Sequence, residues 1–191
     1  MAAIRKPGLL IPVKSCEMLS GHFTWPHLVR LSPAEDADRL PLRRLRDELT
    51  GAGIDARITR SKSAEVRLVR AAGLGDEAYE LTVSDEGAEI RSSTAAGAYY
   101  GAQTLCDLVA LHSRSVPKCV INDSPDLARR GVYLDCSRGK VPKVATVKQL
   151  IERLGRWKIN ELQLYIENTF RYSKHPAIGA GFSPFKPEDI L

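Results

Sequence analysis

The chain has 191 residues, of which 43% are hydrophobic and 27% charged, and its 28 basic against 23 acidic residues give a formal net charge of +5. This is the composition of an ordinary globular protein with one or two domains. The length excludes a complete (β/α)8 barrel beside any other domain, because such a barrel takes about 250 residues.

The excess positive charge is confined to one part of the chain. Residues 1–125 carry 16 basic and 16 acidic side chains, whereas residues 126–191 carry 12 and 7. Neither a basic strand interleaved with aromatic residues nor a recognition-helix pattern accompanies this excess. We therefore expect a solvated basic face and no nucleic-acid partner.

The apolar stretches are short and the cysteines are dispersed. No window approaches the roughly 20 apolar residues that span a bilayer, and the stretch Leu9-Leu10-Ile11 is too short for the apolar part of a secretory signal. We expect no membrane contact and a cytoplasmic location. The four cysteines show neither a CxxC motif nor zinc-type spacing with histidine, so we expect free, mostly buried thiols, no metal site and no cofactor.

The first elements are a strand and a helix. Aromatic and β-branched residues over 21–31 predict a strand, and Ser32-Pro33-Ala34-Glu35 is typical of a helix start with a capping serine. Leu42, Leu45 and Leu49 then form an apolar stripe. We expect Pro41 to bend this helix and a glycine at position 51 or 53 to end it.

Short strands and a long helix follow. Apolar or alternating runs over 54–58, 64–69, 77–83 and 88–92, separated by glycine-containing turns, predict antiparallel strands. Residues 94–111 predict a helix in which Gly97 and Gly101, one turn apart, allow close packing. Residues 1–125 are therefore expected to form an α+β domain, an antiparallel sheet with helices on one face.

The pattern changes after a connector, residues 116–125, that contains one short strand. Residues 130–136 and 159–166 predict strands, and the helix between them, residues 144–157, has one apolar side. A crossover helix of this length implies parallel strands and a right-handed connection. We place a domain boundary between residues 125 and 126.

Polar residues gather at the ends of these two strands, where a parallel barrel carries its reactive groups. Asp135 and Arg138 follow the first strand, and Glu167-Asn168 follow the second. Arg138 can offer a fork of N–H donors to vicinal hydroxyls or to a carboxylate, or it can form a structural ion pair with Asp135 or Glu167, and the spacing leaves both open. His175 lies in the next loop, where it could border a site.

These residues carry a resemblance to a known family. The order Arg130-Gly131-x-x-Leu134-Asp135-x-x-Arg138, followed by Pro142 and Lys158-x-Asn160, resembles the start of the catalytic barrel of family 20 glycoside hydrolases, the β-N-acetylhexosaminidases. Residues 10–14, 21–23 and 87–108 are similar to the N-terminal domain of that family. The resemblance, from about residue 9 to 191, implies a hexosaminidase-like α+β domain over 1–125 and the first β-α-β of a truncated (β/α)8 catalytic barrel over 126–191.

The resemblance also implies residue roles. Arg138 matches the arginine that binds ring hydroxyls of a terminal N-acetylhexosamine, so the partner of the complete enzyme is a glycan with that terminus. In the family the substrate's acetamido oxygen attacks the anomeric carbon, an Asp orients it and the neighbouring Glu protonates the leaving oxygen. That pair follows barrel strand four, so we expect this chain to hold no catalytic residue and to be inactive alone. Family members are often secreted or periplasmic.

The second barrel strand departs from the family pattern. Many members carry His-x-His-x-x-Asp-Asp there, whereas residues 165–170 read YIENTF, which is more similar to a hexosaminidase D-like branch. Asp135, Glu167, Asn168 and His175 are therefore candidates for lining the site or supporting Arg138. The alternative function is a non-catalytic module in which residues 1–125 fold alone and serve packing or carbohydrate contact.

Overall fold

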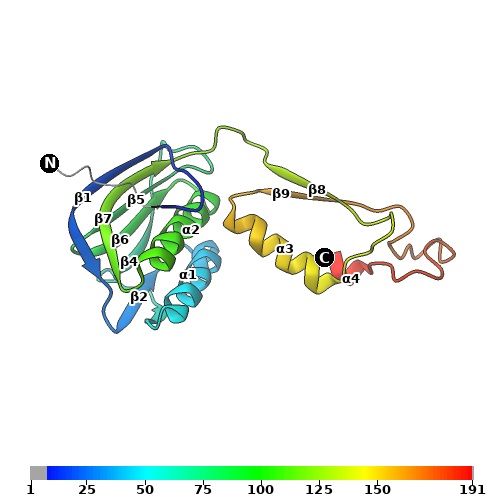
Figure 1. Ribbon diagram of the computed structural model, residues 1–191, viewed down its shortest axis with the longest axis horizontal. Helices are drawn as coiled ribbons and strands as arrows, with labels where there is room; N and C mark the ends of the chain where they lie inside the picture. Colours follow the sequence, from blue (N-terminus) through cyan, green and yellow to red (C-terminus); the bar gives the residue numbers. More distant parts are fainter. Residues whose placement is uncertain (1–7, 191) are drawn as a thin grey trace. The chain divides into compact units, whose positions relative to one another are not determined.

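The computed structural model describes residues 8–190, and the chain divides into two compact units, Met1–Asp126 and Leu127–Leu191 (Figure 1). Each unit has a hydrophobic cluster of its own. Residues 1–7, part of the segment on which the expectation about a secretory signal depends, lie outside the described residues.

The described part of the first unit contains seven strands and two α-helices. The strands are β1 (Ser15–Thr24), β2 (Leu28–Ser32), β3 (Asp55–Ile58), β4 (Val66–Arg70), β5 (Tyr79–Ser84), β6 (Gly87–Ser92) and β7 (Ser115–Asp123). The helices are α1 (Arg39–Gly51), preceded by the 3-10 turn η1 (Asp36–Asp38), and α2 (Ala95–His112). The strands form one sheet in the order β1-β7-β5-β6-β4-β2-β3, and both helices cover the same face of it (Figure 1).

The sheet is mixed, so the prediction of an antiparallel sheet was wrong. Strands β1, β7, β5 and β6 pair antiparallel, but β2 runs parallel to β3 and β4, and β4 runs parallel to β6. A half-buried strand alternates apolar and polar residues whichever way its neighbour runs. The pattern therefore located the strands without indicating their directions.

The strand predicted over residues 21–31 is two strands. β1 ends at Thr24 and lies at one edge of the sheet, whereas β2 begins at Leu28 and pairs with β3 and β4 towards the other edge. Trp25 between them is 1% exposed, and its backbone N–H donates to the carbonyl of Arg114 at 2.9 Å. Pro26, which has no N–H to donate to a ladder, follows at the break.

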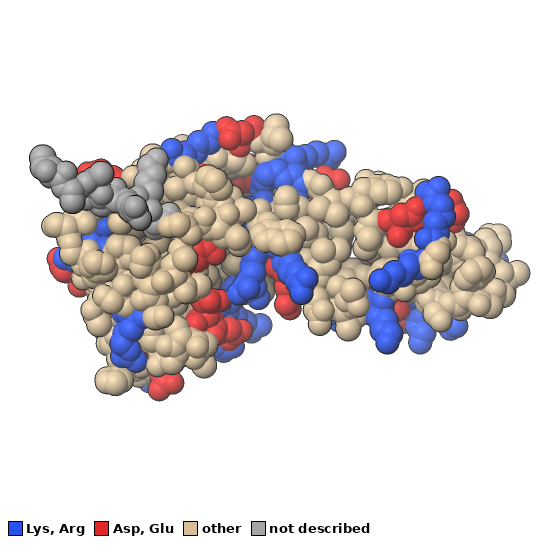
Figure 2. All heavy atoms as spheres, viewed as in Figure 1, with Lys and Arg blue, Asp and Glu red and all other residues tan. Residues whose placement is uncertain are grey.

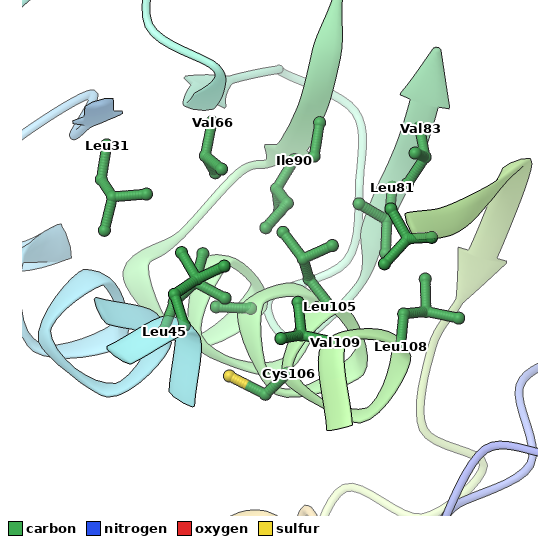
Figure 3. Packing of buried hydrophobic residues seen from close by; sticks show 14 of the residues in the cluster. Leu31, Leu45, Val66, Leu81, Val83, Ile90, Leu105, Cys106, Leu108 and Val109 are labelled. Carbon is green, nitrogen blue, oxygen red and sulfur yellow. The ribbon is translucent and has the colours of Figure 1, made fainter. Parts of the chain in front are cut away.

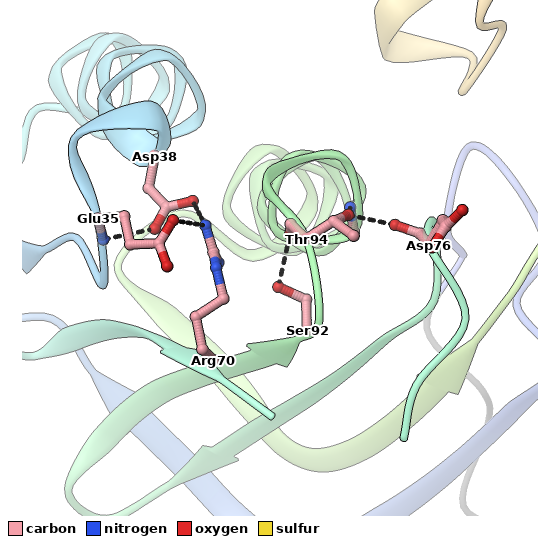
Figure 4. A network of polar contacts seen from close by, with 7 residues as sticks. Glu35, Asp38, Arg70, Asp76, Ser92 and Thr94 are labelled. Carbon is pink, nitrogen blue, oxygen red and sulfur yellow. Dashed lines mark hydrogen bonds and ion pairs between the residues drawn. The ribbon is translucent and has the colours of Figure 1, made fainter. Parts of the chain in front are cut away.

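The first helix begins later than predicted. Ser32 belongs to β2 and caps nothing, while Glu35 and Asp38 form a reciprocal capping box around η1. The fully buried carboxylate of Asp38 accepts the N–H of Glu35 at 2.9 Å and pairs with Arg70 at 2.6 Å (Figure 4). Pro41 lies in the first turn of α1, where a missing N–H removes no intrahelical hydrogen bond.

Helix α2 is the centre of the first core. Side chains of the sheet, including Leu81 and Ile90, point towards Leu105, Leu108 and Val109 on this helix (Figure 3). Its N-cap Thr94 accepts the N–H of Gly97 at 3.2 Å, and its hydroxyl donates to the carbonyl of Asp76 (Figure 4). A Cβ at Gly97 would lie 2.3 Å from the Ala78 carbonyl oxygen, so the expected close packing is that of α2 on the sheet layer.

The second unit is a β-α-β arrangement followed by a loop. It comprises β8 (Gly131–Asp135), α3 (Val144–Arg156), β9 (Glu161–Tyr165) and a short helix, α4 (Pro187–Ile190). Strands β8 and β9 are parallel, as the crossover helix predicted. Val147 and Leu154 of α3 are buried in this unit, and apolar residues of both strands pack in the same cluster: Leu134, Leu162 and Leu164.

The surface charges and the cysteines of the described residues show no unusual grouping. On the face drawn in Figure 2, acidic side chains lie among the basic ones. The four cysteines form no disulfide within the described residues, and Cys106, Cys119 and Cys136 are buried, as predicted. Burial, and then the proximity of Cys16, raise the pKa of the Cys119 thiol to about 12. Across residues 8–190, no helix has the length and hydropathy needed to cross a bilayer.

Candidate functional site

The candidate site lies where β8 and β9 end. Asp135 and Tyr165 are the last residues of the two strands and face each other in the parallel register. Arg138, three residues after Asp135, turns back so that its Nε donates to Asp135 Oδ2 at 2.7 Å. Its guanidinium carbon lies 5.2 Å from the centre of the Tyr165 ring. The predicted Asp135–Arg138 pair is thus formed, beside an aromatic residue of the neighbouring strand.

Asp135 is held as a carboxylate by its own loop. Its Oδ1 accepts the backbone N–H groups of Ser137 at 2.8 Å and Arg138 at 3.2 Å, the geometry of a side chain closing a turn. The Ser137 N–H, followed by the Arg138 side chain, lowers the pKa of Asp135 below its ordinary range. Asp135 therefore stays ionised, and remains paired with Arg138, at a lower pH than an ordinary aspartate would.

This pKa gives a testable pH dependence. The stabilisation from ionised Asp135 is complete above the ordinary carboxyl pKa and is lost as pH falls through the lowered folded value. We expect the ¹³C carboxyl signal of Asp135 to titrate below the ordinary range of an aspartate. Arg138→Ala should raise the Asp135 pKa only in part, since the Ser137 N–H stays. A return to the ordinary value in Arg138→Ala would show that the backbone contributes nothing.

Glu167 contacts Tyr165 rather than Arg138. Its carboxylate accepts the Tyr165 hydroxyl, and its backbone N–H donates to Ser137 Oγ at 2.7 Å. The Ser137 hydroxyl in turn donates to the Tyr165 carbonyl at 3.4 Å. The hydrogen bond to Glu167, then burial, raise the pKa of Tyr165, so the ring stays a neutral phenol at physiological pH. The ends of the two strands are thus tied together by side chains.

The geometry of Arg138 satisfies both interpretations that its spacing left open. Nε is engaged by Asp135, while among the described residues no acceptor binds either terminal nitrogen. The side chain is 69% exposed, so those nitrogens are accessible. The two terminal NH2 groups of a guanidinium can donate side by side to adjacent hydroxyls. An ion pair therefore holds the side chain and leaves its donor fork available.

Two predicted residues lie outside this arrangement. Asn168 is half-buried, and its backbone carbonyl faces Gly179 of the following loop. His175 is exposed and forms a turn, its N–H donating to the Tyr172 carbonyl at 3.2 Å. Within residues 8–190 neither side chain bonds to Asp135, Arg138 or Glu167, and no group of three His, Cys, Asp or Glu side chains is placed to hold a metal ion.

Sequence reasoning missed Tyr165 and Ser137. Tyr165 is the last residue of β9 and alternates with Leu164, the residue that packs in the core, so its side chain lies on the polar face with Gln163. That alternation could have identified it. Ser137 had no such signal, because its contacts are to the backbone of a neighbouring strand.

The remaining motif residues serve the opposite end of the strands. Arg130 donates from Nε to the Lys158 carbonyl and from Nη1 to the Leu127 carbonyl, both at 2.7 Å. Asn160 accepts the Arg130 N–H at 2.9 Å and donates to the Ala128 carbonyl at 2.7 Å. These bonds connect the amino ends of β8 and β9. In parallel barrels the residues at the amino ends of the strands contribute to stability, whereas those at the carboxyl ends contribute to catalysis. The motif therefore combines a structural clamp with the site residues Asp135 and Arg138.

Comparison with known proteins relates the chain to one family. The family model described as Glycosyl hydrolase family 20, domain 2, matches residues 10–124. The β-hexosaminidase of Vibrio vulnificus is 27% identical over 140 residues, covering 71% of this chain and 16% of that protein. The β-N-acetylhexosaminidase of Cellulomonas fimi is 30% identical over 133 residues, covering 66% and 27%.

Solved structures show the same relationship. The Streptomyces plicatus N-acetyl-β-hexosaminidase, in complex with Thio-NAglucal, superimposes with a TM-score of 0.80 at 26% identity, over 91% of this chain and 39% of that one. The chain thus spans well under half the length of these relatives. Because the family model matches more than half of its residues, this chain belongs to glycoside hydrolase family 20, the family of the β-N-acetylhexosaminidases.

Proposed function

We propose that this chain is the N-terminal part of a β-N-acetylhexosaminidase. Residues 1–125 would be its α+β domain and residues 126–191 the first β-α-β of its (β/α)8 catalytic barrel. The faces of β8 and β9 support the second assignment. Their leucines pack in the cluster of α3, as on the outside of a barrel, and the opposite face carries Tyr133, Asp135, Gln163 and Tyr165.

In this proposal Arg138 binds ring hydroxyls of a terminal N-acetylhexosamine. The observation that carries it is the donor fork at the carboxyl end of β8, held at Nε by Asp135 and open at both terminal nitrogens. The carboxyl ends of parallel strands are where such barrels bind substrate. Charge-assisted hydrogen bonds from a fixed guanidinium suit adjacent hydroxyls, whereas a lysine offers only a single point charge.

We propose that residues 1–191 alone are inactive. In the family that the sequence resembles, the acetamido-orienting Asp and the proton-donating Glu follow barrel strand four, and these residues supply only strands one and two under the present assignment. Substrate binding without the general acid gives no hydrolysis. The purified chain should release no nitrophenol from a nitrophenyl N-acetylglucosaminide. Release that Arg138→Ala abolishes would overturn this proposal.

A chimera tests the function directly. Residues 1–191 would replace the matching segment of the Streptomyces plicatus enzyme, which superimposes over 91% of this chain. We expect the chimera to hydrolyse the N-acetylglucosaminide and to leave the corresponding glucoside intact. A chimera that folds by circular dichroism but cleaves neither substrate would contradict the assignment of residues 126–191 to the catalytic barrel.

One observation favours the non-catalytic module as a second candidate. Among the described residues, the core cluster of the first unit contains 24 buried residues, all of them between Trp25 and Ile121. Limited proteolysis separates the two proposals. A stable fragment ending near residue 125, with rapid loss of the remainder, would favour the module, and protection of β8 to β9 as long as β1 to β7 would favour the enzyme part.

A further inference from the structure

We infer that Tyr165 is a positioning residue for Arg138, and that Glu167 acts on the site through the Tyr165 hydroxyl. The ring of Tyr165 supports the guanidinium, and Glu167 fixes the ring. The inference deepens the proposed function and rests on it in one respect, namely that the donor fork of Arg138 binds sugar hydroxyls.

Arg138 needs a second support. Its side chain is 69% exposed, and the bond to Asp135 engages only Nε. One hydrogen bond at Nε leaves the guanidinium plane free to tilt, and long exposed side chains gain entropy by leaving such a geometry. The Tyr165 ring, 5.2 Å from the guanidinium carbon, supplies a face on which a cation is attracted. Asp135 and Tyr165 thus constrain the fork from two neighbouring strands.

The ring itself is fixed by its surroundings. Its hydroxyl donates to the Glu167 carboxylate, and the Tyr133 ring lies 5.8 Å away at an interplanar angle of 33°. Ser137 connects the backbones on either side of the ring, because its hydroxyl accepts the Glu167 N–H and donates to the Tyr165 carbonyl. The orientation of Arg138 therefore depends on contacts that run through Tyr165.

Within the described residues, Glu167 forms neither a hydrogen bond nor an ion pair with Arg138, although its charge favours the guanidinium cation. The two residues have opposite charges and flank the same ring, yet among the described residues they form no ion pair. The Glu167 carboxylate instead accepts a hydrogen bond from the Tyr165 hydroxyl. This arrangement keeps the terminal nitrogens of Arg138 unoccupied, which a direct Arg138–Glu167 pair would not. The Tyr165 side chain thus separates a carboxylate from the donor fork.

Nuclear magnetic resonance on the full 191-residue chain tests this inference without sugar or activity. In the unmodified chain we expect an upfield ring-current shift of the Arg138 Hδ protons and slow solvent exchange of Hε. Tyr165→Phe keeps the ring and should keep most of the shift. Tyr165→Leu should abolish the shift and speed Hε exchange, although Asp135 is still present.

The control is Tyr172→Leu. Tyr172 lies in the same unit and packs on Phe170 at 5.2 Å between ring centres, and the ring that contacts Arg138 among the described residues is that of Tyr165. The Tyr172→Leu substitution should leave the Arg138 signals unchanged. Methyl signals of Val147 and Leu154 report whether the second unit is folded in each variant. Arg138 signals that are the same in folded Tyr165→Leu as in Tyr172→Leu would overturn the inference.

Kinetics of the chimera separate this inference from the proposed function. Tyr165→Leu should lower kcat/KM by about 2- to 5-fold, the effect expected from losing an exposed cation–π contact. If Arg138→Ala leaves hydrolysis unchanged, the sugar-binding role fails, while the resonance experiment still decides whether Tyr165 orients Arg138. If Arg138→Ala abolishes hydrolysis but Tyr165→Leu changes neither kinetics nor Arg138 signals, only the positioning role fails.

Discussion

Arg138→Ala is expected to lower kcat/KM of the chimera for a nitrophenyl N-acetylglucosaminide by about 100-fold, as befits the loss of hydrogen bonds to substrate hydroxyls from a site built to make them. The terminal nitrogens of Arg138 have no acceptor within the described residues, so their donors are available to the substrate. Steady-state kinetics with circular dichroism as a check on folding measures the effect.

Two further variants distinguish binding by the fork from a general effect of charge. Arg138→Lys keeps the charge but loses the planar pair of donors, so we expect most of the loss to persist. Arg171→Ala removes an exposed arginine that follows the Phe170–Phe185 bridge, and it should leave the kinetics unchanged. Equal losses in Arg138→Ala and Arg171→Ala, or full activity in Arg138→Lys, would contradict the role given to the fork.

Gly87→Ala is expected to destabilise the first unit by about 4 kcal/mol, from a disfavoured backbone and an overpacked contact together. Gly87 has φ +120°, and a Cβ there would lie 2.1 Å from the Glu65 carbonyl oxygen. That oxygen accepts the Ala88 N–H at 2.8 Å where β4 and β6 begin to pair. The substitution should therefore force apart two parallel strands in the middle of the sheet.

The matched control for this variant is Gly73→Ala. Gly73 has φ +92°, but a Cβ there would meet no atom within 4 Å, so only the backbone contribution applies, about 1–2 kcal/mol. Urea unfolding followed by Trp25 fluorescence, in a Trp157→Phe background, reports the first unit alone, because Trp25 is buried in its core. Similar losses of unfolding free energy in both variants would show that the contact with Glu65 is unimportant.

Local patterns were sufficient for most elements and for part of the site. The helices predicted over residues 94–111 and 144–157 are α2 and α3, and the parallel β8–β9 pair follows from a crossover of helical length. Asp135 and Arg138 were found because they follow a strand closely, and a side chain three residues from an aspartate can return to it.

Other predictions failed because they depended on distant partners. The helix start was displaced from Ser32 to Arg39 because Asp38, buried against Arg70 of β4, caps the turn before α1. The strand over residues 21–31 was divided because its two halves pair with different strands, β7 and β4, at separate positions in the sheet. Neither partner is visible from local sequence.

The sequence by itself determined the kind of protein this is: the composition, the strand and helix periodicities and the order of Arg130, Asp135 and Arg138 indicated an α+β domain, a parallel β-α-β and the family. Only the tertiary structure decided the strand directions in the seven-stranded sheet, and only it separated Arg130 at the amino ends of β8 and β9 from the Arg138 fork at their carboxyl ends. It also brought Tyr165 to Arg138 from the neighbouring strand. The physical reason is that residue type and spacing encode local conformation, whereas hydrogen bonds and ring contacts between strands depend on which backbones lie side by side.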